Sequence, residues 1–543
     1  MTPVAPAARP RAARRGAVRG ATFVALLLVL AGAPRAARGE TEYDAAAREA
    51  GAALNRKDRP ALRAAVERLR ATDDARAVDL LVRAAKALAD ERDKIEAARR
   101  KDQAEVEAMH TALEREMRRF ERITMPSSLE VDRHTVRRLE LDGRYREAGR
   151  RVLLAGGEVE AIRADLEAVR LSVTAVLGRL DAEAQAAAIA RLLSAWVRSP
   201  GTDAEDRVRF VDAVERVPGP AAAAALREVS EDVRLDPRPR VVALAARVDR
   251  GDEHTVADAI ARLDDPAWSV EAAAIEALRV LHDREAVEPL IAFLGRDGIG
   301  RLREDAHRAL RSLTGEAHGP YREPWETWWR EAKATFELPR RATATRALLA
   351  PRQGVTFYGI TTFSQRVVFV LDVSQSMTEL SPAPGKRPPE ARIEAARREL
   401  AAAVAALDDS ARLAVLTFEE GVRAFETAIV AADRATRERA IAWARSQDPH
   451  GPTNLHAALE EAFRLAAGGV AEKVPTAGAD TIFLLTDGEP TAGAVREPDA
   501  IVAAVKRWHR ASRVVVHCVG LGSHDVALLA AIASATGGQY VAR

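Results

Sequence analysis

Five side chains that can offer only oxygen atoms to a ligand stand at the ends of expected strands in the last third of the sequence. Three follow an apolar run at alternate positions, one precedes an expected helix, and one follows a later apolar run; they are Asp372, Ser374, Ser376, Thr453 and Asp487. The set contains no histidine or cysteine. Carboxylate and hydroxyl oxygens are the ligands that hard divalent cations prefer. The pattern therefore predicts a site for Mg²⁺ or Mn²⁺.

A catalytic interpretation of the same region has less support. Asp487 and Glu489 are close in sequence and would be the pair for hydrolysis, but Gly488 and Pro490 mark a turn, and no nucleophile or base accompanies them. The His-Glu-x-x-His, Walker A and Gly-x-Ser-x-Gly motifs are absent from the sequence. We therefore expect a non-enzymatic protein.

The elements that must position these side chains alternate between strand and helix. Apolar strands are predicted at Val367–Leu371, Leu413–Phe418, Thr481–Leu485 and Arg513–Val519. Helices are predicted between and after them, at residues 391–407, 432–445, 455–467, 498–510 and 525–536. Such a sequence predicts a mainly parallel sheet covered by helices on both faces. In this doubly wound α/β fold ligands bind at the carboxyl ends of strands, which is where the oxygen-bearing residues stand.

Residues 366–543 resemble a von Willebrand factor type A domain, a Rossmann-like fold, with an intact metal-ion-dependent adhesion site. The family pattern of Asp-x-Ser-x-Ser, a separate Thr and a separate Asp is matched in order by the residues named above. The segments Val519–Gly522 and Thr536–Tyr540 also resemble parts of the family's last strand, helix and closing strand. Gln375 stands where many members have glycine, at a position that is not a ligand.

The resemblance implies a function as well as a fold. In the family the hydroxyls touch the cation and the carboxylates often act through bound water, so the cation stays electrophilic. An open sixth position can then accept a carboxylate from an Asp or Glu of a protein partner. The resemblance thus assigns Asp372, Ser374, Ser376, Thr453 and Asp487 as metal ligands. The alternatives are a metal that only joins three loops, and a motif that persists without a bound metal.

Residues 201–338 carry a helical pattern that recurs about every 30 residues. First helices are predicted at 207–217, 240–248, 270–281 and 302–313, and second helices at 221–229, 255–263 and 286–294. A helical pair of this size cannot bury its apolar face alone, so several pairs stack around a continuous core. The pattern resembles a HEAT-like α-solenoid, which would either bind a second protein or act as a spacer.

Three tryptophans follow the last repeat. Trp325, Trp328 and Trp329 are spaced i, i+3 and i+4, which places them on one helix face. This spacing favours a cap over the end of the solenoid. The alternative, an aromatic platform for a base or sugar, would also need a basic groove, and none is evident. Residues 339–365 are expected to be a linker.

Residues 40–200 are expected to be a helical region with a long charged helix. Amphipathic segments at 60–69 and 75–88 flank a turn-like stretch and predict a helical hairpin. From residue 84 to about 123 there is no proline or glycine. The apolar spacing breaks around Lys101 and Asp102, which favours a short coiled-coil or helical-hairpin arm over a continuous two-stranded rod.

The first 39 residues are expected to be a secretory signal peptide. Five arginines and no acid occur in residues 1–20, the apolar run Ala21–Ala33 follows, and Ala37 and Gly39 offer small residues for cleavage. A bilayer-spanning helix needs about 20 apolar residues, so we expect no permanent transmembrane anchor. We expect a secreted or periplasmic protein, and the pair Arg14-Arg15 leaves a twin-arginine export route open.

The net charge changes sign with that cleavage. The 543-residue chain has 82 basic and 80 acidic residues, and removing the seven arginines of residues 1–39 turns a charge of +2 into −5. Nucleic-acid binding thereby loses its main support.

These features together predict a secreted or periplasmic adhesion protein that uses a divalent cation to bind an acidic group of a protein partner. One alternative is a helical-repeat scaffold in which the metal-binding domain is structural. The other is an envelope hydrolase.

Overall fold

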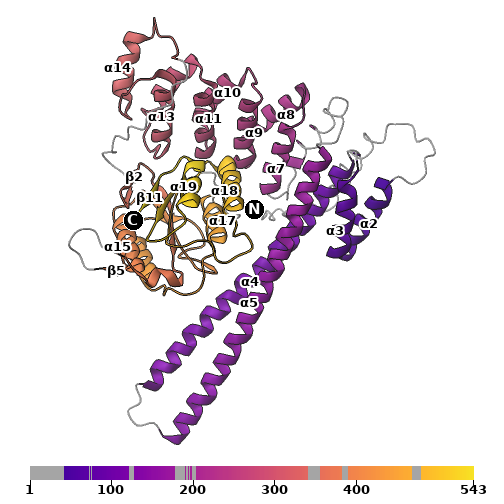
Figure 1. Ribbon diagram of the computed structural model, residues 1–543, viewed down its shortest axis with the longest axis vertical. Coiled ribbons are helices and arrows are strands. Elements are labelled where there is room, and N and C mark those ends of the chain that lie inside the picture. The colour runs from indigo at the N-terminus through magenta and orange to yellow at the C-terminus, as the bar shows by residue number, and fades with distance from the viewer. Residues whose placement is uncertain are drawn as a thin grey trace, which may run out of the picture. The chain divides into compact units, whose positions relative to one another are not determined.

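The computed structural model describes residues 42–72, 74, 76–121, 127–177, 190, 194, 196–198, 204–339, 355–381, 389–467 and 478–543. The predicted signal peptide and residues 340–354 of the predicted linker lie outside these ranges. The chain divides into two compact units, residues 1–72 and residues 73–543. Helices and strands are labelled in Figure 1.

The first unit contains a helical hairpin. Helices α2 (Glu42–Arg56) and α3 (Arg59–Arg70) pack against each other. The carboxylate of Asp58 caps α3 by accepting a hydrogen bond from the backbone N–H of Ala61 at 3.1 Å. The helix predicted at residues 60–69 is confirmed.

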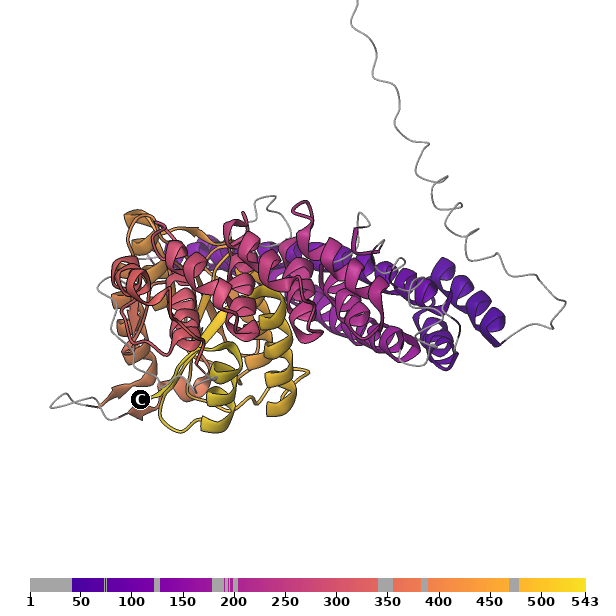
Figure 2. The same ribbon diagram turned by 90° about the horizontal axis from the view of Figure 1, so that it is seen from above.

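The second unit begins with two long helices, α4 (Arg76–Glu121) and α5 (Ser128–Leu177). The two lie side by side in both views (Figure 1, Figure 2), as a helical-hairpin arm. The amphipathic segment predicted at residues 75–88 and the long charged helix predicted from residue 84 to about 123 are parts of a single helix, α4. Where the apolar spacing breaks, α4 contacts α5 through polar side chains: Arg151 donates to Asp102 at 2.9 Å and to Glu105 at 2.6 Å. Among the described helices, none is both long and apolar enough to cross a membrane.

The helices predicted for residues 204–314 are all present, in the predicted order. The first helices of each pair are α7 (Ala204–Glu215), α9 (Pro237–Asp249), α11 (Trp268–Leu281) and α13 (Leu302–Thr314). The second helices are α8 (Pro220–Glu231), α10 (Thr255–Ala261) with the 3₁₀ turn η1 (Arg262–Asp264), and α12 (Val287–Phe293) after the 3₁₀ turn η2 (Arg284–Ala286). Each first helix contacts the next along the chain.

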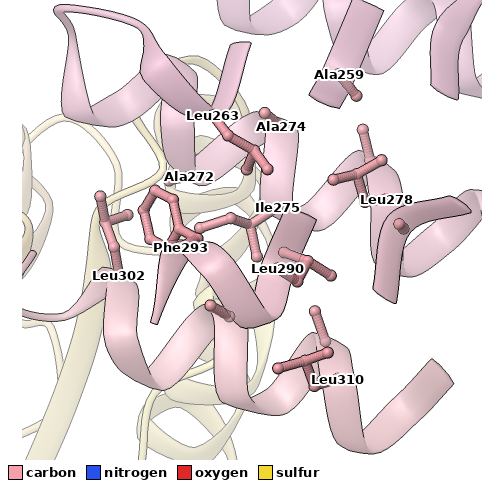
Figure 3. Close-up of a cluster of buried hydrophobic side chains, with 14 of the residues drawn as sticks. Ala259, Leu263, Ala272, Ala274, Ile275, Leu278, Leu290, Phe293, Leu302 and Leu310 are labelled. Carbon is pink, nitrogen blue, oxygen red and sulfur yellow. The ribbon is translucent and has the colours of Figure 1, made fainter. Parts of the chain in front are cut away.

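Successive helix pairs share one apolar core (Figure 3). Ile275 and Leu278 of α11, Leu290 of α12 and Leu310 of α13 are all at most 1% exposed. A single pair would leave this surface in water, at a cost of about 25 cal/mol for each Å² of apolar area. The pairs therefore stabilise one another.

The tryptophans lie on α14 (Arg322–Ala332), which packs against α12. Trp325 is 0% exposed and Trp329 is 6% exposed, and both belong to the core of the helix pairs. The indole N–H of Trp325 donates to the backbone carbonyl of Gly319 at 2.7 Å. Trp328 is partly buried and packs against the same core, so the three indoles contribute to the packing of the helix pairs.

The rest of the second unit is a mixed sheet with helices on both faces. Its strand order is β11-β10-β9-β3-β6-β7, and β8 also pairs with β6. The strands are β3 (Arg366–Asp372), β6 (Arg412–Phe418), β7 (Val422–Ala424), β8 (Val430–Ala431), β9 (Thr481–Thr486), β10 (Val515–Gly520) and β11 (Tyr540–Ala542). The helices are α15 (Arg392–Ala405), α16 (Arg434–Arg445), α17 (Leu455–Ala466), α18 (Pro498–Ser512) and α19 (Val526–Thr536).

The pairing of the strands confirms the predicted, mainly parallel sheet. β11, β10, β9, β3 and β6 pair in parallel. One apolar core lies between the sheet and α17, α18 and α19, and a second lies between the sheet and α15 and α16. Both faces are therefore covered, as a doubly wound fold requires.

Several short antiparallel strands were not predicted. β1 (Val355–Phe357) pairs with β2 (Ile360–Thr362) inside the segment expected to be a linker, so the linker prediction is wrong for this part. β4 (Leu380–Ser381) pairs with β5 (Glu390–Ala391), and β7 and β8 each pair with β6. Strands this short show no periodic pattern that sequence analysis can detect.

The helix pairs contact the amino-terminal edge of the sheet. Glu304 of α13 accepts hydrogen bonds from the hydroxyl of Thr362 at 2.7 Å and from the backbone N–H of Phe363 at 2.6 Å, shortly before β3. The side chain of Arg301 is 5% exposed and donates to the backbone carbonyl of Arg513 at 3.0 Å, shortly before β10. These contacts lie at the opposite edge of the sheet from the candidate site residues.

Replacing Glu304 with alanine should lower the free energy of unfolding of the full chain by about 2 kcal/mol. The reason is that two hydrogen bonds to a carboxylate are lost and the N–H of Phe363 is left without its acceptor. Urea denaturation followed by circular dichroism measures the change. The control is Glu323→Ala, at an exposed glutamate of α14; an equal loss in both variants would contradict the role assigned to Glu304.

Acid should destabilise the protein through His509 of α18. Burial and the nearby Arg513 lower the pKa of this imidazole to about 3, below the value of about 6.5 in unfolded chains. The unfolded state therefore binds the proton first, so the stabilisation is complete above pH 6.5 and is lost as the pH falls toward 3. Between pH 7 and pH 5 the free energy of unfolding should fall by about 2 kcal/mol more in the unchanged protein than in His509→Asn.

Urea denaturation at the two pH values measures that difference. His254→Asn, at an exposed histidine, is the control. If His509→Asn and the control respond to pH alike, His509 is not the group responsible.

Candidate functional site

Asp372 is the last residue of β3 and is 0% exposed. One of its carboxylate oxygens accepts a hydrogen bond from the backbone N–H of Ser374 at 2.8 Å, and the other accepts one from the hydroxyl of Thr486 at 2.5 Å. Because both oxygens are held, the carboxylate has a fixed orientation at the carboxyl edge of the sheet.

Ser374 directly precedes the 3₁₀ turn η3 (Gln375–Thr378), where the chain leaves β3, and Ser376 lies on this turn. Their hydroxyl oxygens are 3.1 Å apart. The hydroxyl of Ser376 also donates to Oδ1 of Asp487 at 2.7 Å. Two segments that are far apart in the sequence thus meet through these polar side chains, because β3 and β9 are neighbours in the sheet.

Thr453 lies in the loop before α17, and two backbone hydrogen bonds fix this loop to the turn after β3. The N–H of Gln375 donates to the carbonyl of Gly451 at 3.0 Å, and the N–H of His450 donates to the carbonyl of Val373 at 2.9 Å. The structure therefore brings Thr453, which is 4% exposed, to the same edge of the sheet as Asp372.

Gly488 marks the point where the three segments converge. A Cβ atom at this position would lie 3.2 Å from Oγ1 of Thr453 and 3.8 Å from Oγ of Ser376. The absence of a side chain after Asp487 thus leaves room for both hydroxyls. All five residues predicted from the sequence lie around this point. Glu489 is exposed, whereas Asp487 is buried, so the structure gives no support to a catalytic pair of these two residues.

Two further residues of the site were not predicted from the sequence. Thr486 holds Asp372, and its only signal is a polar residue at the end of an apolar strand. Arg392, the first residue of α15, places Nη1 2.9 Å from Oδ2 of Asp487, whose side chain is 0% exposed. No local pattern marks this arginine, because the contact depends on how α15 packs against η3 and β3.

The electrostatics of the site favour a positive charge next to Asp372. Burial raises the pKa of this carboxyl to about 6, while hydrogen bonds from Ser374 and Thr486 oppose the rise. The charge of Asp487 raises the pKa of Asp372 further. A cation held at this point would offset the cost of burying the carboxylate.

The donor set fits a hard divalent cation. Adjacent ligands of an octahedral ion with metal–oxygen distances of about 2.1 Å are about 3.0 Å apart. The Ser374–Ser376 separation of 3.1 Å and the Ser376–Asp487 separation of 2.7 Å are both close to that value. Across the described ranges no three His, Cys, Asp or Glu side chains converge on one point, so a metal here would depend on the hydroxyl oxygens.

Residues 365–542 match the von Willebrand factor type A domain family. This part of the chain is therefore a domain of that family, as its sequence resemblance predicted. No curated protein matches the chain.

Several solved structures are similar to about a third of the chain. A von Willebrand factor type A protein from Catenulispora acidiphila is 23% identical, covers 33% of this chain and has a TM-score of 0.27, and the chain spans 38% of that protein. BatB from Bacteroides thetaiotaomicron is 18% identical over 33% of this chain and 89% of its own, with a TM-score of 0.25. The PilB minor pilin from Streptococcus sanguinis is 15% identical over 33% of this chain and 56% of its own, with a TM-score of 0.24.

Thr486→Val should lower the free energy of unfolding by about 1 to 3 kcal/mol, because it removes a hydrogen bond to the buried carboxylate of Asp372 at nearly constant volume. The matched control is Thr417→Val on β6. Thr417 is also 0% exposed, but its hydroxyl has no hydrogen-bond partner in the described part of the chain, so valine there should be neutral or stabilising. Thermal and urea unfolding check both variants, and equal losses would contradict the role of Thr486.

Proposed function

We propose that this chain is an exported, non-enzymatic protein whose von Willebrand factor type A domain binds an acidic group of a protein partner through a divalent cation. The observation that carries the proposal is the convergence of hydroxyl and carboxylate oxygens at the carboxyl edge of the sheet. Ser374 and Ser376 are 3.1 Å apart, and Ser376 is 2.7 Å from Asp487. Thr453 lies at the same point across Gly488.

Each of these residues has a role in the proposed metal-ion-dependent adhesion site. The hydroxyls of Ser374, Ser376 and Thr453 would hold Mg²⁺ or Mn²⁺ without neutralising it, and Asp372 and Asp487 would supply the negative charge. When bound, the cation supplies a Lewis-acidic position that attracts a carboxylate of the partner. The chain's own contribution is a fixed set of oxygens, because the hydrogen bonds to Asp372 and Asp487 hold both carboxylates in place.

We propose that residues 201–338 form a HEAT-like solenoid that carries this domain and offers a surface for a second protein. The shared core of α9 to α14 supports this role, because it extends from one helix pair to the next. The alternative is a scaffold in which the metal is structural. That alternative predicts partner binding that does not depend on the cation.

The amino-terminal sequence supports export to a secreted or periplasmic location. Its arginine-rich start and apolar run, residues 1–33, have the layout of a signal peptide.

Mg²⁺ should stabilise the full chain. At a concentration 100 times its Kd, the cation should raise the free energy of unfolding by about 2.7 kcal/mol, because it binds the folded state only. Ser376→Ala should lose most of this gain, whereas Ser534→Ala, at an exposed serine of α19, should keep it. Urea denaturation with and without Mg²⁺ measures the difference, and a lack of stabilisation in the unchanged protein would refute the metal site.

The same proteins separate adhesion from the scaffold alternative. Immobilised full chain should retain partners from an envelope extract in Mg²⁺, and should lose them in EDTA or with Ser376→Ala. Equal retention under all conditions would favour the scaffold.

A further inference from the structure

Arg392 places a permanent positive charge inside the candidate site. Its Nη1 is 2.9 Å from Oδ2 of Asp487, and its Nη2 is 2.9 Å from Oε2 of Glu379. Its backbone N–H also donates to the carbonyl of Glu379 at 2.9 Å. The arginine side chain is only 10% exposed, so the charge is shielded little by solvent.

The surrounding backbone leaves space for this guanidinium. Gly522, in the loop after β10, has φ of +54°, and a Cβ atom there would lie 2.5 Å from Nε of Arg392. A side chain at residue 522 would therefore collide with the arginine, in a conformation that favours glycine. Both the fold of this loop and the start of α15 thus accommodate Arg392 next to Asp487.

The two carboxylate oxygens of Asp487 have different partners. Oδ1 accepts the hydroxyl of Ser376, which belongs to the candidate metal site, and Oδ2 accepts Arg392. Asp487 would otherwise be a buried carboxylate with no opposite charge when the cation is absent, which is strongly destabilising. Arg392 pairs with Asp487 and thereby removes that cost. Its positive charge also repels a divalent cation that approaches the site.

We propose that Arg392 is a built-in countercharge that keeps the cation-free site folded and weakens its affinity for Mg²⁺. The inference rests on the proposed function, since it concerns the same site. The site with its cation bound contains two carboxylates, one divalent cation and Arg392, which together give a formal charge of +1. Without the arginine the same site would have a formal charge of zero. The exposed Glu379, whose side chain is 62% exposed, is shielded by water and offsets this charge only in part. The loaded site therefore attracts an acidic ligand more strongly than a neutral site would.

Calorimetric titration of the full chain with MgCl₂ tests the proposal, using Arg392→Gln, which removes the charge, and Arg392→Lys, which retains it. Arg392→Gln should bind Mg²⁺ roughly tenfold more tightly than the unchanged protein and should melt at a lower temperature without the cation. Arg392→Lys should keep Kd within about threefold, because the charge is still present. The matched control is Arg398→Gln on the same helix, which pairs with Glu390 and should leave Kd unchanged.

The possible outcomes separate this inference from the proposed function. If the unchanged protein binds Mg²⁺ and Arg392→Gln binds it equally or more weakly, only the role of Arg392 is refuted. If no variant binds Mg²⁺, the proposed function fails and this inference fails with it. If Arg392→Gln does not fold alone, recovery of folded protein in Mg²⁺ supports the countercharge role, and failure to recover at saturating Mg²⁺ refutes it.

Discussion

The common direction of the central strands is the constraint on which the rest of the structure depends. Parallel strands all end at the same edge of a sheet, so the residues that follow β3 and β9 meet although a long stretch of chain separates them. For the same reason the parallel strands all begin at the other edge of the sheet. There Glu304 and Arg301 of the helical region form hydrogen bonds. The polarity of one sheet therefore separates the candidate site from the contact that attaches the helical region.

Buried charges have a different role at each edge. At the amino-terminal edge, Glu304 is enclosed by donors from the segment before β3, and Asp480 accepts from the hydroxyls of Ser364 and Thr481, so these carboxylates join elements. At the carboxyl edge, Asp372 and Asp487 are held as firmly, but they stand beside three hydroxyl groups that belong to flanking turns. The second arrangement brings two carboxylates and three hydroxyls near one point, which is the chemistry that a hard cation needs.

The helical region and the von Willebrand factor type A domain are joined by more than the covalent chain. α18 pairs with α7 through Arg510, which lies 3.0 Å from Asp212 and 2.6 Å from Glu215, in addition to the contacts of α13. The helix pairs build their own core, and the sheet has two others. A carrier role for the helices is consistent with this division. Arg163 of α5 adds a further contact, 3.0 Å from Glu460 of α17.

The sequence by itself determined the helix pairs, the parallel strands and the five oxygen-bearing residues, because apolar periodicity and strand-end motifs are local properties. It did not reveal the short strands β1, β2, β4, β5, β7 and β8, which have too few residues for a pattern. The long charged helix was predicted as well, from the absence of proline and glycine between residues 84 and about 123, but its contact with Arg151 of α5 depends on the tertiary structure. Arg392 at Asp487 and Glu304 at the edge of the sheet were decided only by the tertiary structure, because each depends on packing between elements that are distant in the chain.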